Sequence, residues 1–124
     1  MTGTIAPPTV AEVADICDKA ACHMDRVGFH QGALYSGCQA DAGTPLEGCR
    51  VDVVGALNFA AHGSARFGCE DGPERRAALR AEVAVQNHLG ADLIDWNDAA
   101  ERTKEQVVQA LRDTATGLRA GVTP

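Results

Sequence analysis

The side chains of this sequence that could carry out covalent chemistry are its cysteines, histidines and carboxylates. A cysteine becomes an efficient nucleophile when the fold brings a histidine base and an orienting carboxylate to it. Cys49 or Cys38 could supply the thiol, His30 or His62 the base, and Asp52 the carboxylate. No nucleophile-elbow motif singles out one of them. The resulting hypothesis is a small tailoring or hydrolytic enzyme that uses His30, Asp52 and a cysteine, with Cys49 as the candidate nucleophile.

Asp52 lies in a valine-rich stretch that is predicted to be helical. A carboxyl group placed near an apolar core has a raised pKa and could transfer protons. The interpretation that the sequence favours is a side chain exposed to solvent between Val51 and Val53, because aspartate is seldom buried without a partner. His62 and His88 lie close to glycines at predicted helix ends, where a histidine commonly interacts with the C-terminal dipole.

Cysteine and histidine are also ligands that zinc prefers, and the chain has five cysteines and four histidines. Structural zinc usually takes two pairs of ligands, each at short spacing. No C-x-x-C motif occurs, and Cys17 and Cys22 lie five residues apart on one predicted helix, so they point in different directions. The sequence therefore predicts no metal site. A thiol- or metal-responsive regulator is a further alternative, which free-thiol reactivity would test.

A second group of candidate residues could bind a ligand without catalysis. Trp96 is the only tryptophan, and Asn97 and Asp98 follow it directly. One interpretation is that Trp96 packs against the core while Asn97 and Asp98 bond to backbone N–H groups. The other is a polar ligand pocket beside the indole ring. The candidate ligand-binding residues are Tyr35, Trp96, Asn97 and Asp98.

Composition and charge exclude several classes of function. With 124 residues, the chain is long enough for one domain with a single core. A net charge of −6 argues against binding to nucleic acid or to an anionic membrane surface. The N-terminal residues lack the pattern of a signal peptide, and no apolar run reaches the length of a membrane span, so we expect a cytoplasmic protein. No glycine-rich phosphate-binding motif occurs, and the sequence identifies no cofactor.

Four principal helices are predicted to position these residues, since only 4% of the residues are aromatic and the chain is rich in alanine. The first helix starts after a capping box at Thr9 and ends near Val27, with Cys17 on its buried stripe and Cys22 and His23 away from it. The second starts at Thr44-Pro45 and runs to Gly63, with Gly55 allowing a neighbour to approach closely. Phe29–Gly43, between these helices, is expected to be irregular, with a small hairpin as an alternative.

The third principal helix starts at Pro73 and ends at Gly90, and we expect Leu79, Val83, Gln86 and Leu89 to face the core. Asp98 is expected to cap a short turn, and the last helix runs from Thr103 to about Arg119. Residues 64–72 connect the second and third helices and contain Phe67 and Cys69. Residues 1–8 are expected to form a loose arm, and residues 120–124 a frayed end.

The closing segment resembles a known family. Trp96-Asn97-Asp98, Arg102-Thr103 and the helix that follows resemble DUF6197, a family of small actinobacterial and actinophage proteins of unknown function. Gly32-Ala33 and Gly55-Ala56-Leu57 extend the resemblance along most of the chain. The resemblance implies a fold and a lineage, and no established activity. In that family a cysteine often lies three residues before the second Gly-Ala, and the Asp52 found here weakens the idea of a family cysteine nucleophile.

The sequence thus predicts a compact, mainly α domain of four principal helices, with a short irregular or β segment between the first two. The leading hypothesis is a small cytoplasmic accessory protein that binds a small molecule or a protein partner. Its binding surface would combine Phe29–Gly43, Gly48–Asp52 and Trp96–Asp98, because loops carry much of the function on a helical scaffold.

Overall fold

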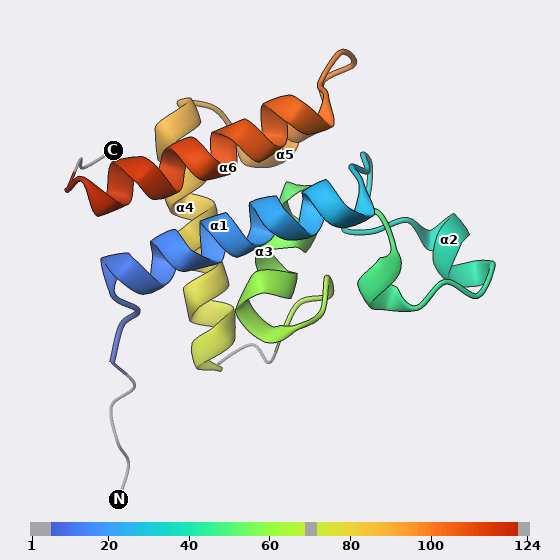
Figure 1. The fold of residues 1–124 in the computed structure, drawn as a ribbon, viewed down its shortest axis with the longest axis horizontal. Coiled ribbons are helices and arrows are strands. Elements are labelled where there is room, and N and C mark those ends of the chain that lie inside the picture. Colours follow the sequence, from blue (N-terminus) through green and yellow to red (C-terminus); the bar gives the residue numbers. More distant parts are fainter. Residues whose placement is uncertain (1–5, 69–71, 122–124) are drawn as a thin grey trace, which may run out of the picture.

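Helices make up almost all of the regular structure in the computed structural model, which describes residues 6–68 and 72–121 (Figure 1). The mainly α fold with four long helices is therefore confirmed. The elements in chain order are α1 (Val10–Val27), α2 (Gly37–Asp41), the 3-10 turn η1 (Leu46–Gly48), α3 (Val53–His62), α4 (Pro73–Leu89), α5 (Leu93–Asn97) and α6 (Lys104–Arg119).

Local capping interactions explain where most of the long helices begin and end. Thr9 and Thr103 form the predicted capping boxes of α1 and α6, in which each hydroxyl accepts a hydrogen bond from the backbone N–H three residues later. Pro73 occupies the first position of α4. Gly63 and Gly90 follow α3 and α4 in the left-handed conformation, with φ of 87° and 67°, which glycine adopts without steric cost.

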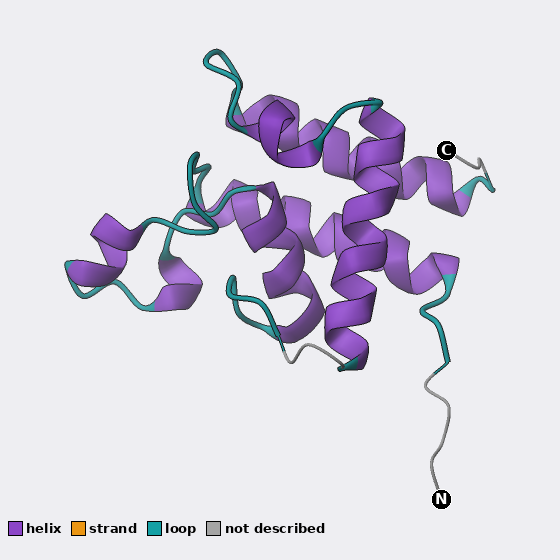
Figure 2. Cartoon of the chain, turned by 180° about the vertical axis from the view of Figure 1, so that it is seen from behind, coloured by secondary structure: helices purple, strands orange, loops and turns teal. Residues whose placement is uncertain are grey.

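The long helices are arranged around α1. Helix α6 lies alongside α1, and α4 crosses both of them from behind, as Figures 1 and 2 show. Arg119 of α6 pairs with Asp15 of α1 at 2.7 Å and also with Asp18, while Lys104 pairs with Asp25 at 3.4 Å near the other end. The core is built mainly from small and medium side chains, and its largest fully buried members include Met24, Leu57, Leu93 and Leu111.

The predicted helix start at Thr44 is wrong. Leu46–Gly48 forms only a 3-10 turn, the chain is then extended as far as Val51, and α3 begins at Val53 with Asp52 as its N-cap. Val51 forms isolated bridges with both Phe29 and Tyr35, so tertiary pairing holds this stretch extended. The same bridges replace the hairpin considered for the first irregular segment, where the structure also has the short helix α2 at one side of the molecule (Figure 1).

Three side chains on the long helices also differ from the prediction. Leu79 and Val83 of α4 are 42% and 47% exposed, and the face turned inward carries Ala78, Ala81 and Ala84 together with Val85. Small side chains on this inner face allow α4 to pack closely across α1 and α3. On α1, His23 is buried and stacks on Phe59 of α3, with 3.6 Å between ring centroids. Helix α1 buries more than one stripe because it packs against both α3 and α6.

The prediction that Asp98 caps the start of a turn is also wrong. Asp92 caps α5 by accepting a hydrogen bond from the Asp95 N–H, and Asp98 follows the last residue of that helix. Trp96 and Asn97 therefore belong to a short helix, which fixes the directions of both side chains.

Some expectations fall outside the described part of the chain. Residues 1–5 of the expected arm, residues 122–124 of the expected frayed end, and Cys69 are not among the described residues. Within 6–68 and 72–121, no helix combines the length and the apolar character needed to cross a bilayer.

Candidate functional site

Asn97 is the centre of a hydrogen-bond network that joins three distant segments. Its side chain is completely buried. The Asn97 Oδ1 accepts from the Val53 N–H at 2.9 Å, at the first residue of α3. The Asn97 Nδ2 donates to the His30 carbonyl at 3.3 Å and to Asp98 Oδ1 at 2.9 Å. Both N–H groups of this amide and one lone pair of its oxygen are thus used within the protein.

Asp98 and Gln31 extend this arrangement, which we call the Asn97 network. Asp98 Oδ1 accepts from the Gly32 N–H at 3.1 Å. Gln31 Nε2 donates to the carbonyls of Asn97 and Ala99 at 2.9 and 2.8 Å. The network brings together the three segments that were predicted from the sequence to form one surface, because it ties the Phe29–Gly43 segment and the start of α3 to α5. The side chain of Asn97 and the bonded oxygen of Asp98 are engaged in holding these segments.

Asp52 lies next to this network and is buried, with 4% of its surface exposed, so the prediction of a solvent-facing side chain is wrong. Its position as N-cap turns the carboxylate back toward the helix, where Oδ1 accepts from the Gly55 N–H at 2.6 Å. Burial raises the pKa of Asp52 to about 7. Backbone N–H bonds at the start of α3 oppose this shift, and the neighbouring carboxylates of Asp98 and Glu82 add to it.

The raised pKa predicts a pH dependence of stability. The folded-state pKa lies above the unfolded value of 3.8, so the folded protein holds this proton more tightly, and the resulting stabilisation is lost as the pH rises through about 7. Asp52→Asn keeps a good N-cap and removes the titration. As the pH rises from 4 to 8, we expect the unfolding free energy of the mutant to increase relative to that of wild type. The expected gain is about 2 kcal/mol, below the linkage limit of roughly 4 kcal/mol, because a carboxylate can draw water toward itself.

Urea unfolding of both proteins at several pH values measures this difference. Asp92→Asn is the matched control, since Asp92 is the exposed N-cap of α5. Its unfolding free energy should stay parallel to that of wild type over the same interval. If the difference in unfolding free energy between Asp52→Asn and wild type does not change with pH, the pKa of Asp52 is not raised in the folded protein.

Two aromatic candidates are each covered by an arginine. The Arg102 guanidinium lies 3.9 Å from the centre of the Trp96 ring, and Arg102 Nε donates to the Trp96 carbonyl at 2.8 Å. The indole also packs against the core. Tyr35 is half-buried, and Arg66 donates to its hydroxyl through Nε and Nη2 at 3.2 and 3.1 Å. The interpretation in which Trp96 packs agrees with this geometry.

The three catalytic candidates have different environments. Cys49 is fully buried, and its thiol donates to the Pro45 carbonyl at 3.4 Å. His30 is half-buried, and burial together with Arg50 lowers its pKa, although Asp98 raises it. Asp52 is enclosed at the start of α3. Cys49 therefore has no open path to a substrate, and no described contact joins the three side chains.

The remaining thiols and imidazoles of the described chain are dispersed. Cys17 is buried, and burial raises its pKa to about 12, which makes it a poor nucleophile. Cys22 and Cys38 are exposed. In the part of the chain that the structure describes, no three His, Cys, Asp or Glu side chains come together as metal ligands.

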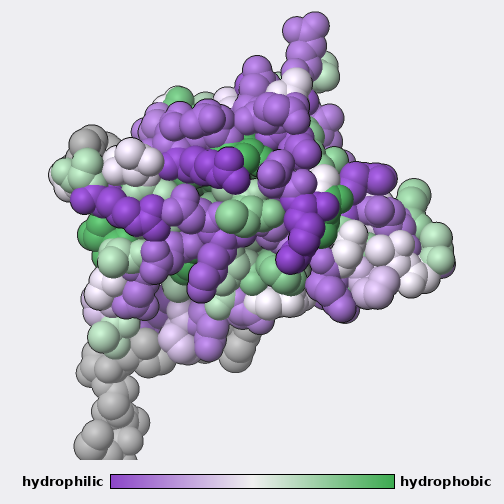
Figure 3. All heavy atoms as spheres, in the orientation of Figure 1, coloured by the Kyte–Doolittle hydropathy of each residue, from purple (hydrophilic) through white to green (hydrophobic). Residues whose placement is uncertain are grey.

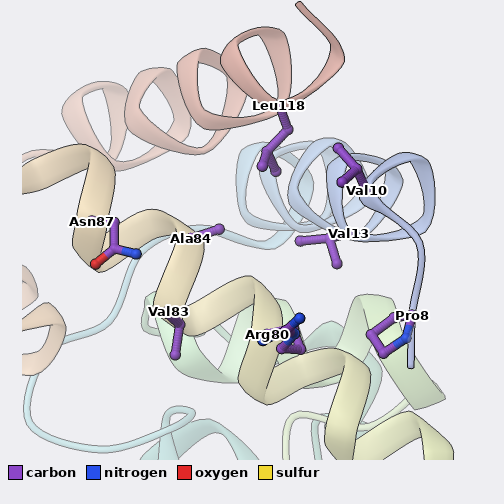
Figure 4. Close-up of a pocket in the computed structure, with 8 residues that line it drawn as sticks. All are labelled: Pro8, Val10, Val13, Arg80, Val83, Ala84, Asn87 and Leu118. Atoms are coloured by element: carbon purple, nitrogen blue, oxygen red, sulfur yellow. The ribbon is translucent and has the colours of Figure 1, made fainter. Parts of the chain in front are cut away.

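The structure also contains an apolar groove that was not predicted from the sequence. Residues from three helices line it, and its volume is about 290 Å³ (Figure 4). Its lining residues are Pro8, Val10, Val13, Arg80, Val83, Ala84, Asn87 and Leu118. A second hollow shares Pro8 and Arg80 and adds Pro7, Arg76 and Leu79. We call the two hollows together the α4 groove.

Comparison with known proteins gives the family. A family model described as "Family of unknown function (DUF6197)" matches residues 8–117. The chain belongs to DUF6197. Searches of curated proteins and of solved structures found no match.

In this DUF6197 chain, the residues that carried the resemblance have structural contacts. Asn97 and Asp98 form the Asn97 network, Arg102 lies on Trp96, and Thr103 caps α6. Gly55 lies against the backbone of Leu34, as the expected close approach required. These contacts give the residues of the motif structural roles within the chain.

One signal in the DUF6197 sequence could have indicated the α4 groove. Ala78, Ala81 and Val85 recur at helical spacing on α4, as do Leu79 and Val83. Either stripe could face the core, and the prediction places the larger side chains of Leu79 and Val83 there. The alanine stripe lies inward because it permits close packing, which leaves Leu79 and Val83 on the groove.

Proposed function

We propose that this DUF6197 protein is a cytoplasmic, non-catalytic accessory protein that binds a helix of a protein partner in the α4 groove. One observation carries the proposal. Five large hydrophobic side chains of the described residues are exposed, and three of them, Val10, Leu79 and Val83, gather at this groove. At the end of the molecule where α1 begins, Figure 3 shows apolar surface bordered by hydrophilic side chains. An exposed apolar patch of this kind is typical of an interaction site.

The shape of the groove favours a helix as the occupant. Figure 4 shows Val10, Val13 and Leu118 projecting from α1 and α6, with α4 forming the opposite side. Along α4, the lining residues extend from Arg76 to Asn87, a distance of about 16 Å at the helical rise per residue. Three turns of a docked amphipathic helix fit such a length, with apolar side chains at intervals of three and four residues.

The small-molecule alternative has less support. The Asn97 network uses the side chain of Asn97 and one carboxylate oxygen of Asp98 internally, and Arg102 covers the Trp96 ring. A ligand at this surface would compete with contacts that hold α3 and α5 together. The α4 groove can be filled without breaking any described hydrogen bond.

Site-specific photocrosslinking in the cells that make the protein tests this proposal. A photoreactive phenylalanine analogue replaces Val83 in the groove or, as a matched control, Ile94, which is 43% exposed on α5. We expect one discrete heteromeric product from position 83 and none from position 94. The product should fall at least about tenfold when Leu79→Asp is added, because docking would lose the apolar contact of Leu79 and would have to desolvate a charged side chain.

Three outcomes would contradict the proposal. These are the absence of a product from position 83, equal products from positions 83 and 94, and a product that contains only two copies of this chain. Because Leu79 is exposed, its replacement should leave the unfolding free energy within about 0.5 kcal/mol of wild type. Urea unfolding of the Leu79→Asp variant verifies this.

A further inference from the structure

The exposed face of α4 carries positive charge beside its apolar side chains. Arg76 and Arg80 lie one turn apart and flank Leu79, and all three side chains are exposed. Val83 continues the same face toward the C-terminal end of the helix. Both hollows of the groove therefore combine apolar side chains with at least one arginine.

This basic surface belongs to an acidic protein of net charge −6. Nearby arginines are paired: Arg75 contacts Glu82 at 3.4 Å, and Arg119 contacts Asp15 at 2.7 Å. Among the described residues, Arg76 and Arg80 have no ion-pair partner.

Three acidic side chains, two of α1 and one at the start of α4, lie around a different hollow. Glu12, Asp15 and Glu74 line a space between α1, α3 and the start of α4, and this space shares no lining residue with the α4 groove. The positive charge of Arg76 and Arg80 is therefore available to a bound partner.

We infer that the partner segment is an acidic amphipathic helix, whose apolar side chains contact Leu79 and Val83 and whose carboxylates pair with Arg76 and Arg80. This inference rests on the proposed function, since it names the chemistry of the helix that would occupy the groove. Arginine pairs with carboxylates through two parallel hydrogen bonds, so it selects acidic partners by geometry as well as by charge.

A second copy of this chain fits the groove less well. In a two-fold dimer the same surface faces itself, and the arginines of both copies would come together. Like charges that meet in this way oppose association. The exposed apolar part consists mainly of Val10, Leu79 and Val83, which is small compared with the interface that a stable dimer needs.

A displayed library of helical peptides tests the charge of the occupant. The peptides have about 16 residues, apolar residues at intervals of three and four, and random residues elsewhere. Binders are selected on the wild-type protein, and those that also bind Val83→Asp are discarded. We expect the remaining sequences to contain more Asp and Glu than Lys and Arg next to the apolar positions.

A charge reversal provides the quantitative test. The selected peptides, labelled with fluorescein, should bind the Arg76→Glu/Arg80→Glu double variant roughly tenfold more weakly than wild type, as expected for the loss of two exposed ion pairs. The matched control is Arg112→Glu, which reverses an exposed arginine of α6 outside the groove and should leave binding within about twofold. Selection on the double variant should instead enrich basic peptides.

The outcomes separate the inference from the proposed function. Groove-dependent peptides without an acidic excess, or with affinities that do not respond to the double reversal, would overturn the inference and leave helix binding in place. If no selected peptide depends on Val83, helix binding in the α4 groove is itself wrong.

Discussion

Replacing Gly55 by alanine should destabilise the protein by more than about 3 kcal/mol. A Cβ atom at this position would lie 2.0 Å from the Leu34 carbonyl oxygen and 3.0 Å from its carbon. These are backbone atoms, so no side-chain rotation can relieve the clash. Leu34 O also accepts a hydrogen bond from the Asp52 N–H at 3.1 Å, and the required movement would break the contact that leads the chain into α3. Urea or thermal unfolding measures the loss.

Gly117→Ala in α6 is the matched control, and its effect should have the opposite sign. A Cβ at Gly117 meets no heavy atom within 4 Å, and the residue lies inside a helix. Alanine is favoured over glycine in a helix by roughly 0.5–1 kcal/mol, so this variant should be more stable than wild type. Equal effects of the two substitutions would show that helix propensity, and not the contact with Leu34, determines the result.

Asn97→Ala should destabilise the protein by about 3 kcal/mol. The substitution leaves the buried Val53 N–H without its acceptor and removes the donor that reaches the His30 carbonyl. A buried polar group that loses its partner costs about 1–3 kcal/mol, and the space left by the side chain adds to this loss. The unfolding free energy in urea measures the effect.

Asn87→Ala removes the same type of side chain from an exposed position on α4 and should change stability by less than about 0.5 kcal/mol. Hydrogen exchange adds a local readout, because the Val53 amide should lose protection in Asn97→Ala at conditions where α6 stays protected. If Asn97→Ala loses no more stability than Asn87→Ala, the Asn97 network does not hold α3 to α5.

The molecule thus separates a structural centre from a proposed binding surface. The Asn97 network and Gly55 hold the start of α3, and replacement of Asn97 or Gly55 should reduce the free energy of unfolding. The α4 groove is exposed, and replacement of Leu79 or Val83 should change binding with stability maintained. This separation allows folding and partner binding to be tested with different variants.

The sequence alone determined the number of long helices and most of their ends. The signals at Thr9, Thr103, Pro73 and Gly90 act within one helical turn, so they do not depend on the rest of the fold. The residues around Trp96 likewise indicated DUF6197, which the family comparison shows. The combination of three segments into one region was also predicted, although the network that joins them was not.

Only the tertiary structure decided the features that depend on distant partners. Asp52 is buried and starts α3 because Val51 pairs with Phe29 and Tyr35, which no local pattern reveals. Leu79 and Val83 are exposed because close packing against α1 and α3 favours the alanine face of α4. A helix has two possible apolar stripes when alanine and larger residues alternate along it, and the stripe that is buried depends on the space that neighbouring helices leave.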